Sequence, residues 1–181
     1  TQFIKSGNGT ATLTGSNTFT GVTSISQGTL NIQNDIALGT GAVNVLGSAI
    51  LEMQNGISVA NALSLSTNAA IGTLRNVSGN NTWSGSILIP TAQSHINVAA
   101  DSLTVSGPIT SNGYGVKNGP GTLILTGVNG GSGYMDVAQG IVSLRSDTAA
   151  VGNYFHVTSS AAVVELYGGI TIPSTETVYL T

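Results

Sequence analysis

The feature that most constrains this chain is a long internal repeat. Residues 9–32 read GTATLTGSNTFTGVTSISQGTLNI, and residues 121–144 read GTLILTGVNGGSGYMDVAQGIVSL. The second segment follows the first at an interval of about 112 residues, which is too long for one coil of a solenoid and suits a block of several coils. The matched positions that we interpret as structural repeat residues are Gly9, Leu13, Gly15, Asn17, Gly21 and Gly28 and, in the same order, Gly121, Leu125, Gly127, Asn129, Gly133 and Gly140.

The pattern within each copy is that of short β-strands separated by glycine corners. In residues 10–14, Ala11 and Leu13 fall on one face and three threonines fall on the other, which is the two-residue period of a half-buried strand. Glycine and asparagine then follow, and these residues favour turns. No stretch keeps a helical period for three turns, so we predict an all-β chain with essentially no helix.

A chain of short strands can form a sandwich, a barrel or a solenoid. The second copy of a long block, the glycine corners and a content of only 6% charged residues favour the solenoid. We therefore predict a single parallel β-helix over residues 1–181, with repeat cores near 4–65 and 116–180 and intervening coils over 66–115. At roughly 20–25 residues per coil, the chain would hold about eight coils around a column of apolar side chains.

Composition excludes several classes of partner. A net charge of −3 with four basic residues gives no footprint for nucleic acid. No apolar run reaches the roughly 18 residues of a membrane-spanning helix, so we expect a chain that does not span a membrane. Cysteine is absent, which excludes disulfides and thiol chemistry. The first residues, TQFIKSGNG, lack the features of a signal peptide, and we expect a mature product or a piece of something longer.

Most charged residues recur between the two copies. A catalytic residue is normally unique, whereas a structural residue repeats with its coil, so we predict turn or surface roles for the recurring residues. The recurring pairs are Lys5 and Lys117, Asp35 and Asp147, and Glu52 and Glu165.

Enzymatic chemistry has little support in the sequence. A polysaccharide-processing β-helix needs two or three carboxylates that converge on one face. The best candidate group is Asp136, Arg145 and Asp147, of which Asp136 and Arg145 are particular to the second copy. His95 and His156 are far apart and lie in no metal-ligand motif. We therefore predict no catalytic residues, no metal and no cofactor.

The aromatic residues look scattered along the sequence. Packing in the core or at corners is their expected role, and binding to the faces of glycans is the alternative. These residues are Phe19, Trp83, Tyr114, Tyr134, Tyr154, Phe155, Tyr167 and Tyr179.

The repeated segments resemble the autotransporter-associated β-strand repeat, also called the passenger-associated transport repeat, of bacterial autotransporter passengers and large surface β-helix proteins. KSGNGT at residues 5–10 and KNGPGT at 117–122 look like its lead-in, and DIALG at 35–39 looks like its following loop. The resemblance implies a right-handed parallel β-helix that is exported to the bacterial surface. The second copy departs from the first at Gly130-Gly131 and at Tyr134-Met135.

From these observations we expect a non-catalytic, extracellular or cell-surface β-solenoid that forms a stiff stalk, coat or fibre. Its partners would be copies of itself, stacked end to end as a filament, or further coils of a longer chain. The alternative is an adhesin that presents loops and aromatic residues to glycans or host surfaces. A polysaccharide-processing enzyme is the third reading.

Overall fold

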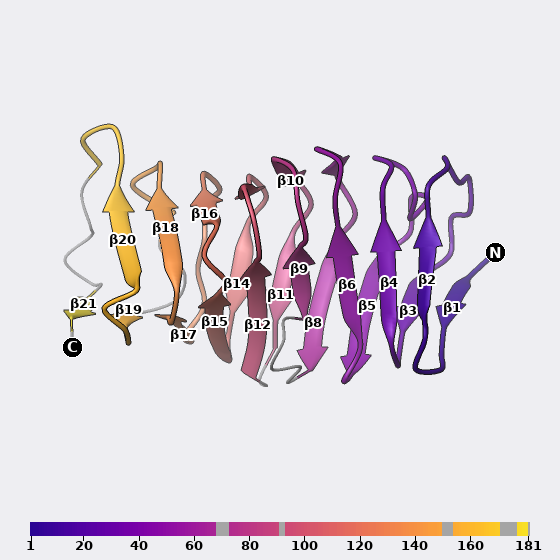
Figure 1. Ribbon diagram of the computed structural model, residues 1–181, viewed down its shortest axis with the longest axis horizontal. Coiled ribbons are helices and arrows are strands. Elements are labelled where there is room, and N and C mark those ends of the chain that lie inside the picture. The colour runs from indigo at the N-terminus through magenta and orange to yellow at the C-terminus, as the bar shows by residue number, and fades with distance from the viewer. Residues whose placement is uncertain (68–72, 91–92, 150–153, 171–176, 181) are drawn as a thin grey trace.

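The computed structural model is a stack of short strands in three parallel sheets (Figure 1). The structure describes residues 1–67, 73–90, 93–149, 154–170 and 177–180. Parts of the predicted intervening coils and of the second repeat core therefore lie outside the described residues. In the described part of the chain every strand pairing is parallel and no helix occurs, which confirms the prediction of an all-β parallel solenoid.

In the middle of the chain successive strands enter the three sheets in turn, whereas the first strands alternate between sheets 1 and 2 and the last between sheets 2 and 3. Each strand extends its sheet by one position. Sheet 1 holds β1 (Phe3–Lys5), β3 (Thr23–Ile25), β5 (Val43–Gly47), β8 (Leu63–Thr67), β11 (Ile87–Ile89) and β14 (Ile109–Ser111). Sheet 2 holds β2 (Thr10–Leu13), β4 (Thr29–Ile32), β6 (Ile50–Met53), β9 (Leu74–Asn76), β12 (Gln93–Val98), β15 (Tyr114–Asn118), β17 (Tyr134–Val137), β19 (Tyr154–Val157) and β21 (Thr177–Leu180). Sheet 3 holds β7 (Ser58–Val59), β10 (Asn81–Trp83), β13 (Ser102–Val105), β16 (Thr122–Leu125), β18 (Gly140–Leu144) and β20 (Ala162–Leu166).

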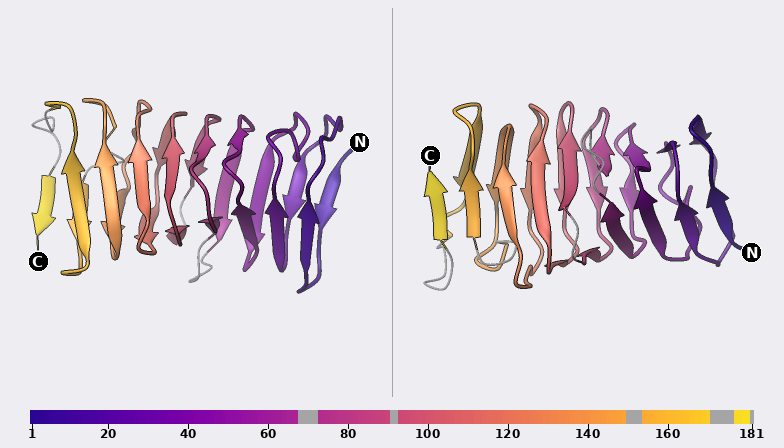
Figure 2. Two further views of the ribbon diagram at one scale, coloured as in Figure 1. Left: turned by 45° about the horizontal axis from the view of Figure 1, so that its top comes forward. Right: turned by 90° about the horizontal axis from the view of Figure 1, so that it is seen from below.

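Sheet 2 runs along the whole stack and gives the number of coils. Its nine strands are joined by parallel pairings from β2 to β21, so the described chain makes about eight coils, as predicted. Figure 2 shows the strands stacked along one axis in two further views, with the two termini at opposite ends.

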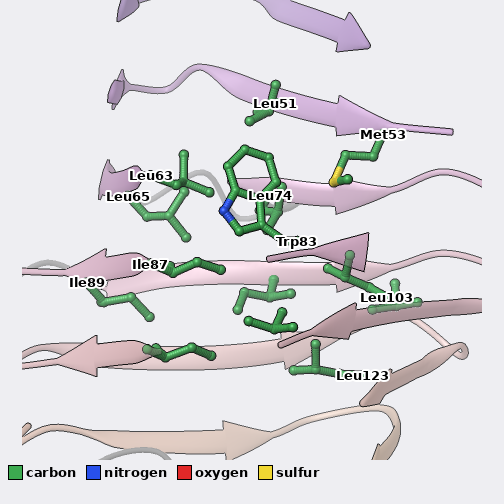
Figure 3. Packing of buried hydrophobic residues seen from close by; sticks show 14 of the residues in the cluster. Leu51, Met53, Leu63, Leu65, Leu74, Trp83, Ile87, Ile89, Leu103 and Leu123 are labelled. Atoms are coloured by element: carbon green, nitrogen blue, oxygen red, sulfur yellow. The ribbon is translucent and has the colours of Figure 1, made fainter. Parts of the chain in front are cut away.

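The core is a column of apolar side chains that point inward from all three sheets. Leu51 pairs with Leu74 and Leu74 with Ile96 along sheet 2, so side chains of one kind stack coil on coil. Trp83 from sheet 3 packs into the same column and is fully buried (Figure 3). The two-residue period of each strand places these residues inside and leaves the alternate residues on the outer face.

The two repeat copies lie on different sheets. Strands β1 to β4 of the first copy alternate between sheets 1 and 2, whereas the matched strands β15 to β18 alternate between sheets 2 and 3. With coils of about 21 residues, an interval of about 112 residues is five coils and a third, so the second copy begins one face further round the solenoid. The repeat therefore specifies a corner and its flanking strands, and two different corners of the solenoid hold it.

Candidate functional site

Two glycines that we singled out in the sequence occupy equivalent corners in the two copies. Gly28 and Gly140 have φ values of +66° and +72°, a region that side chains rarely adopt. A Cβ atom at Gly28 would lie 2.5 Å from the carbonyl oxygens of Gly7 and Gly9, and one at Gly140 would meet the matched carbonyls of Gly119 and Gly121. At both corners, glycine is needed for its backbone conformation and for the close approach of the preceding coil.

Four of the other predicted glycines, Gly21, Gly121, Gly127 and Gly133, lie where successive coils approach closely. A Cβ atom at Gly21 or Gly133 would meet backbone oxygen of the preceding coil, and one at Gly127 would meet Gly107 in the same way. At Gly121 it would lie 2.7 Å from Val98 Cγ1. Gly9 and Gly15, which match Gly121 and Gly127 in the first coil, have no atom within 4 Å of such a Cβ. The predicted leucines also point inward: Leu125 is fully buried, and Leu13 packs partly buried against the core.

Lys5 and Lys117 lie inside the solenoid and bind its turns, so of the turn or surface roles predicted for this pair the surface role is wrong. Lys117 is fully buried, and its Nζ donates hydrogen bonds to the carbonyl oxygens of Asn118 (3.1 Å), Gly119 (2.8 Å) and Gln139 (2.9 Å). Lys5 Nζ donates to the matched carbonyl oxygens of Gly7 (2.7 Å) and Gln27 (3.0 Å). Each lysine joins the turn of its own coil to the next coil from within.

Asn17 and Asn129 bind successive coils together at matched corners. Asn17 Nδ2 donates to Ala37 O at 2.7 Å, and Asn129 Nδ2 donates to Ala149 O at 2.6 Å. Asn129 Oδ1 also accepts a hydrogen bond from the backbone N–H of Ile109 at 2.7 Å. One side chain therefore connects its own coil with both of its neighbours.

Replacing Asn129 by leucine is expected to lower the free energy of unfolding by about 2 kcal/mol, because the Ile109 N–H and the Ala149 carbonyl would each lose their side-chain partner. Aspartate keeps the acceptor and removes the donor. N129D should therefore keep the hydrogen bond from the Ile109 N–H and lose less free energy of unfolding than N129L. Urea unfolding of the wild type, N129D and N129L measures both effects. Equal stability of all three proteins would show that this corner does not hold the coils together.

Asp136, Arg145 and Asp147, the best candidate group for catalysis in the sequence, do not all converge on one face of the solenoid. Asp136 lies on sheet 2, whereas Arg145 follows the last residue of β18 in sheet 3 and places its guanidinium 4.6 Å from the centre of the Tyr167 ring. Asp147 lies in the turn after β18. Asp136 and Arg145 therefore do not share a face of the solenoid.

The tyrosines, which look scattered in the sequence, form a ladder on the outer face of sheet 2. The ring centres of Tyr114 and Tyr134 are 4.6 Å apart, and those of Tyr134 and Tyr154 are also 4.6 Å apart. Tyr179 meets Tyr154 edge to face with ring centres 5.3 Å apart. Tyr114, Tyr134 and Tyr154 follow one another at intervals of 20 residues, close to the length of one coil, and this spacing is the signal in the sequence that could have revealed the ladder.

Polar groups lie beside this ladder on the same outer face. The Tyr114 hydroxyl donates a hydrogen bond to Asp136 Oδ2, and Asp136 Oδ1 lies 3.4 Å from His156 Nδ1. Burial, and next the hydrogen bond to Asp136, raise the pKa of the Tyr114 hydroxyl far above its ordinary value. We call Tyr114, Tyr134, Tyr154, Tyr179, Asp136 and His156 the tyrosine cluster.

The two histidines lie in separate environments. His95 Nδ1 is 2.7 Å from Asn118 Nδ2, and burial lowers the pKa of the imidazole. His156 belongs to the tyrosine cluster. Among the described residues no group of three or more metal-ligating side chains occurs.

Among the hollows on the surface of the described chain, two bear on the choice of a candidate site. The first, of about 230 Å³, is lined by residues around Asp35 and Asn61, and Asp35 Oδ1 already accepts the backbone N–H of Ser58 at 2.8 Å. The second, of about 270 Å³, is lined by Tyr154, His156 and Tyr179 and so belongs to the tyrosine cluster. The second hollow combines aromatic rings with hydrogen-bonding groups and is the better candidate for a binding site.

Three parallel sheets around one apolar column, with the same glycine and lysine corner built twice, define a β-solenoid made of repeats. The family model of the passenger-associated transport repeat matches residues 3–32 and 116–144. Two segments of the chain thus match the passenger-associated transport repeat, which confirms the resemblance seen in the sequence. Neither the curated proteins nor the solved structures give a match.

This repeat on a β-solenoid fits the passenger domain of an autotransporter, and the family suggests a surface or secreted location. Among the described residues, no helix has the length and apolar character needed to cross a membrane.

Proposed function

We propose that this chain is a non-catalytic, stiff section of an extracellular stalk, coat or fibre on a bacterial surface. The observation that supports the proposal best is the unbroken pairing of the nine strands of sheet 2, which joins every coil to the next along the stack. Sheets 1 and 3 add parallel pairings on the other two faces. Bending would have to open pairings on one face while compressing the close-packed column inside.

Side-chain contacts between coils add to this stiffness. The buried lysines and the corner asparagines each join one coil to the next, and each such bond contributes about 1 kcal/mol to stability. The partners that we propose for such a rod are further coils of the same kind, from a longer chain or from another copy.

Small-angle X-ray scattering and negative-stain electron microscopy over a dilution series test the rod. Nine strands spaced about 4.8 Å apart predict a rigid stack about 38 Å long for one copy, with a cross-section that does not change with concentration. Longer rods of the same width at high concentration would support end-to-end assembly. A scattering curve typical of a flexible chain would contradict the proposal.

A binding module is the second candidate function, and one observation favours it. The tyrosine cluster gathers aromatic rings, a carboxylate and an imidazole on one outer face of the rod. Adhesion of beads coated with the protein to glycan-bearing mammalian cells tests this function. Adhesion no greater than that of uncoated beads would contradict it.

A further inference from the structure

The two repeat copies provide an internal comparison for the tyrosine cluster. The residues that form the corners are the same in both copies, whereas the members of the cluster are replaced. Where the second copy has Tyr134, Asp136, Tyr154 and His156, the first copy has Val22, Ser24, Ala42 and Asn44. The strands that carry the two sets are equivalent in the repeat, so the fold forms equally well without the cluster.

The aromatic part of the cluster ends in an exposed ring. Tyr134 and Tyr154 stack nearly parallel, with 12° between their planes, so each covers a face of the other. Tyr179 stands at 85° to Tyr154 and at 81° to the His156 ring, and half of its surface is exposed. Tyr179 is thus perpendicular to both other rings that line the hollow, and its ring forms an aromatic wall that is exposed to solvent.

The polar part of the cluster orients the imidazole of His156. Asp136 is only 9% exposed, and its Oδ1 atom is buried without a hydrogen bond among the described residues. That atom lies 3.4 Å from His156 Nδ1, while Oδ2 accepts the hydroxyl of Tyr114. Because the carboxylate faces Nδ1, the Nε2 edge of the ring faces away from Asp136 and can bond to a ligand.

We propose that the hollow between Tyr154, His156 and Tyr179 binds a pyranose sugar. An aromatic wall suits the apolar C–H face of a pyranose ring, and the phenol hydroxyls and the imidazole suit its hydroxyl groups. The cluster contains one carboxylate and neither lysine nor arginine, which suits a neutral ligand better than a phosphate or sulfate. The hollow of about 270 Å³ holds one sugar unit, with solvent around it.

This inference rests on the second candidate function, the binding module, and not on the stiffness of the rod. A single shallow hollow predicts weak binding of one sugar unit, with a Kd of about 1 mM or above. Useful adhesion would then come from many copies that bind together.

The test is an NMR titration of the tyrosine and histidine ring signals of the whole chain. The probes are methyl β-D-galactopyranoside, methyl β-D-glucopyranoside and methyl α-D-mannopyranoside, with glycerol as the control for a non-specific polyol. We expect saturable shifts of the His156 and Tyr179 signals with at least one pyranoside and none with glycerol. Absence of a saturable shift with all three pyranosides would overturn the proposal.

The variants for this test carry the residues of the first copy. Y154A and H156N should fold, because alanine and asparagine occupy the equivalent positions at Ala42 and Asn44. We expect each to weaken pyranoside binding at least tenfold. Y179S removes the exposed ring and serves in place of Y154A if that variant does not fold. Y167A, which changes another exposed tyrosine outside the hollow, should bind like the wild type.

The adhesion of coated beads separates failure of this site from failure of the binding function. If beads coated with the wild type and with H156N adhere equally well, and pyranosides give no shift, the chain binds glycans elsewhere and the proposed site is wrong. If H156N and Y154A lose both adhesion and pyranoside binding, both proposals are supported.

Discussion

Replacing Gly140 by alanine is expected to lower the free energy of unfolding by about 3 kcal/mol. The residue has φ of +72°, and an added Cβ atom would lie 2.6 Å from the carbonyl oxygen of Gly121 and closer still to that of Gly119. Both atoms belong to the backbone of the preceding coil, so they can move only if the pairing between the coils changes. Urea unfolding, followed by far-ultraviolet circular dichroism, measures the loss.

The matched control for this prediction is Gly9→Ala in the first coil. Gly9 is a repeat glycine too, but its φ is not positive and no atom lies within 4 Å of an added Cβ. Its substitution should change the free energy of unfolding by no more than about 0.5 kcal/mol. If G9A and G140A were equally destabilising, loss of glycine as such, and not the crowded corner, would be the cause.

The strands and their parallel stacking could be predicted from the sequence because they depend on local patterns. The alternation in residues 10–14 gives the strand, the glycine at 28 gives the corner, and the second copy indicates a solenoid rather than a sandwich. These features repeat with every coil, so an error in one strand does not change the architecture.

The rotation of the second copy by one face could not be predicted in the same way. It depends on the sum of the coil lengths between the copies, and paired residues along sheet 2 advance by a variable number, from roughly 19 to 23 residues per coil. Insertions of one or two residues at the corners are enough to change that sum. Sequence patterns locate corners to within a few residues only, so the accumulated uncertainty exceeds a third of a coil.

The tyrosine cluster and the buried lysine were missed for different reasons. The tyrosines look scattered when each is read alone, and only the equal intervals from Tyr114 to Tyr134 and from Tyr134 to Tyr154, which match a coil, indicate the ladder. The sequence predicts a turn or surface role for Lys117 because the residue recurs with its coil as Lys5. In the structure Lys117 points inward, and Val116 is covered on the outer face.

Lys117 illustrates how a charge can be retained in an apolar column. Its neighbours along sheet 2 are Ile96 and Val137, and both are fully buried. This burial lowers the pKa of Lys117 from 10.5 to about 8. The charged amine donates to three carbonyl oxygens, whereas the neutral amine has only two N–H groups to donate.

We therefore expect the free energy of unfolding to rise with pH between about 8 and 10.5 because of this residue. Below pH 8 the lysine is charged in both the folded and the unfolded chain, so the full cost of burying the charge opposes folding. Above pH 8 the folded protein releases the proton first, while the unfolded chain still binds it, and the cost falls. The gain from pH 8 to 9.5 should be about 2 kcal/mol.

Urea unfolding of the wild type and of Lys117→Met at pH 7.5, 8.5 and 9.5 measures this gain. Methionine fills a similar volume without a titrating group, so the free energy of unfolding of K117M should vary much less over this range. The range ends below pH 10 because the raised pKa of Tyr114 acts in the opposite sense there: the unfolded chain loses the tyrosine proton first, which favours unfolding. If K117M kept the rise of the wild type, another group would be its source, and the buried charge at Lys117 would cost the fold little.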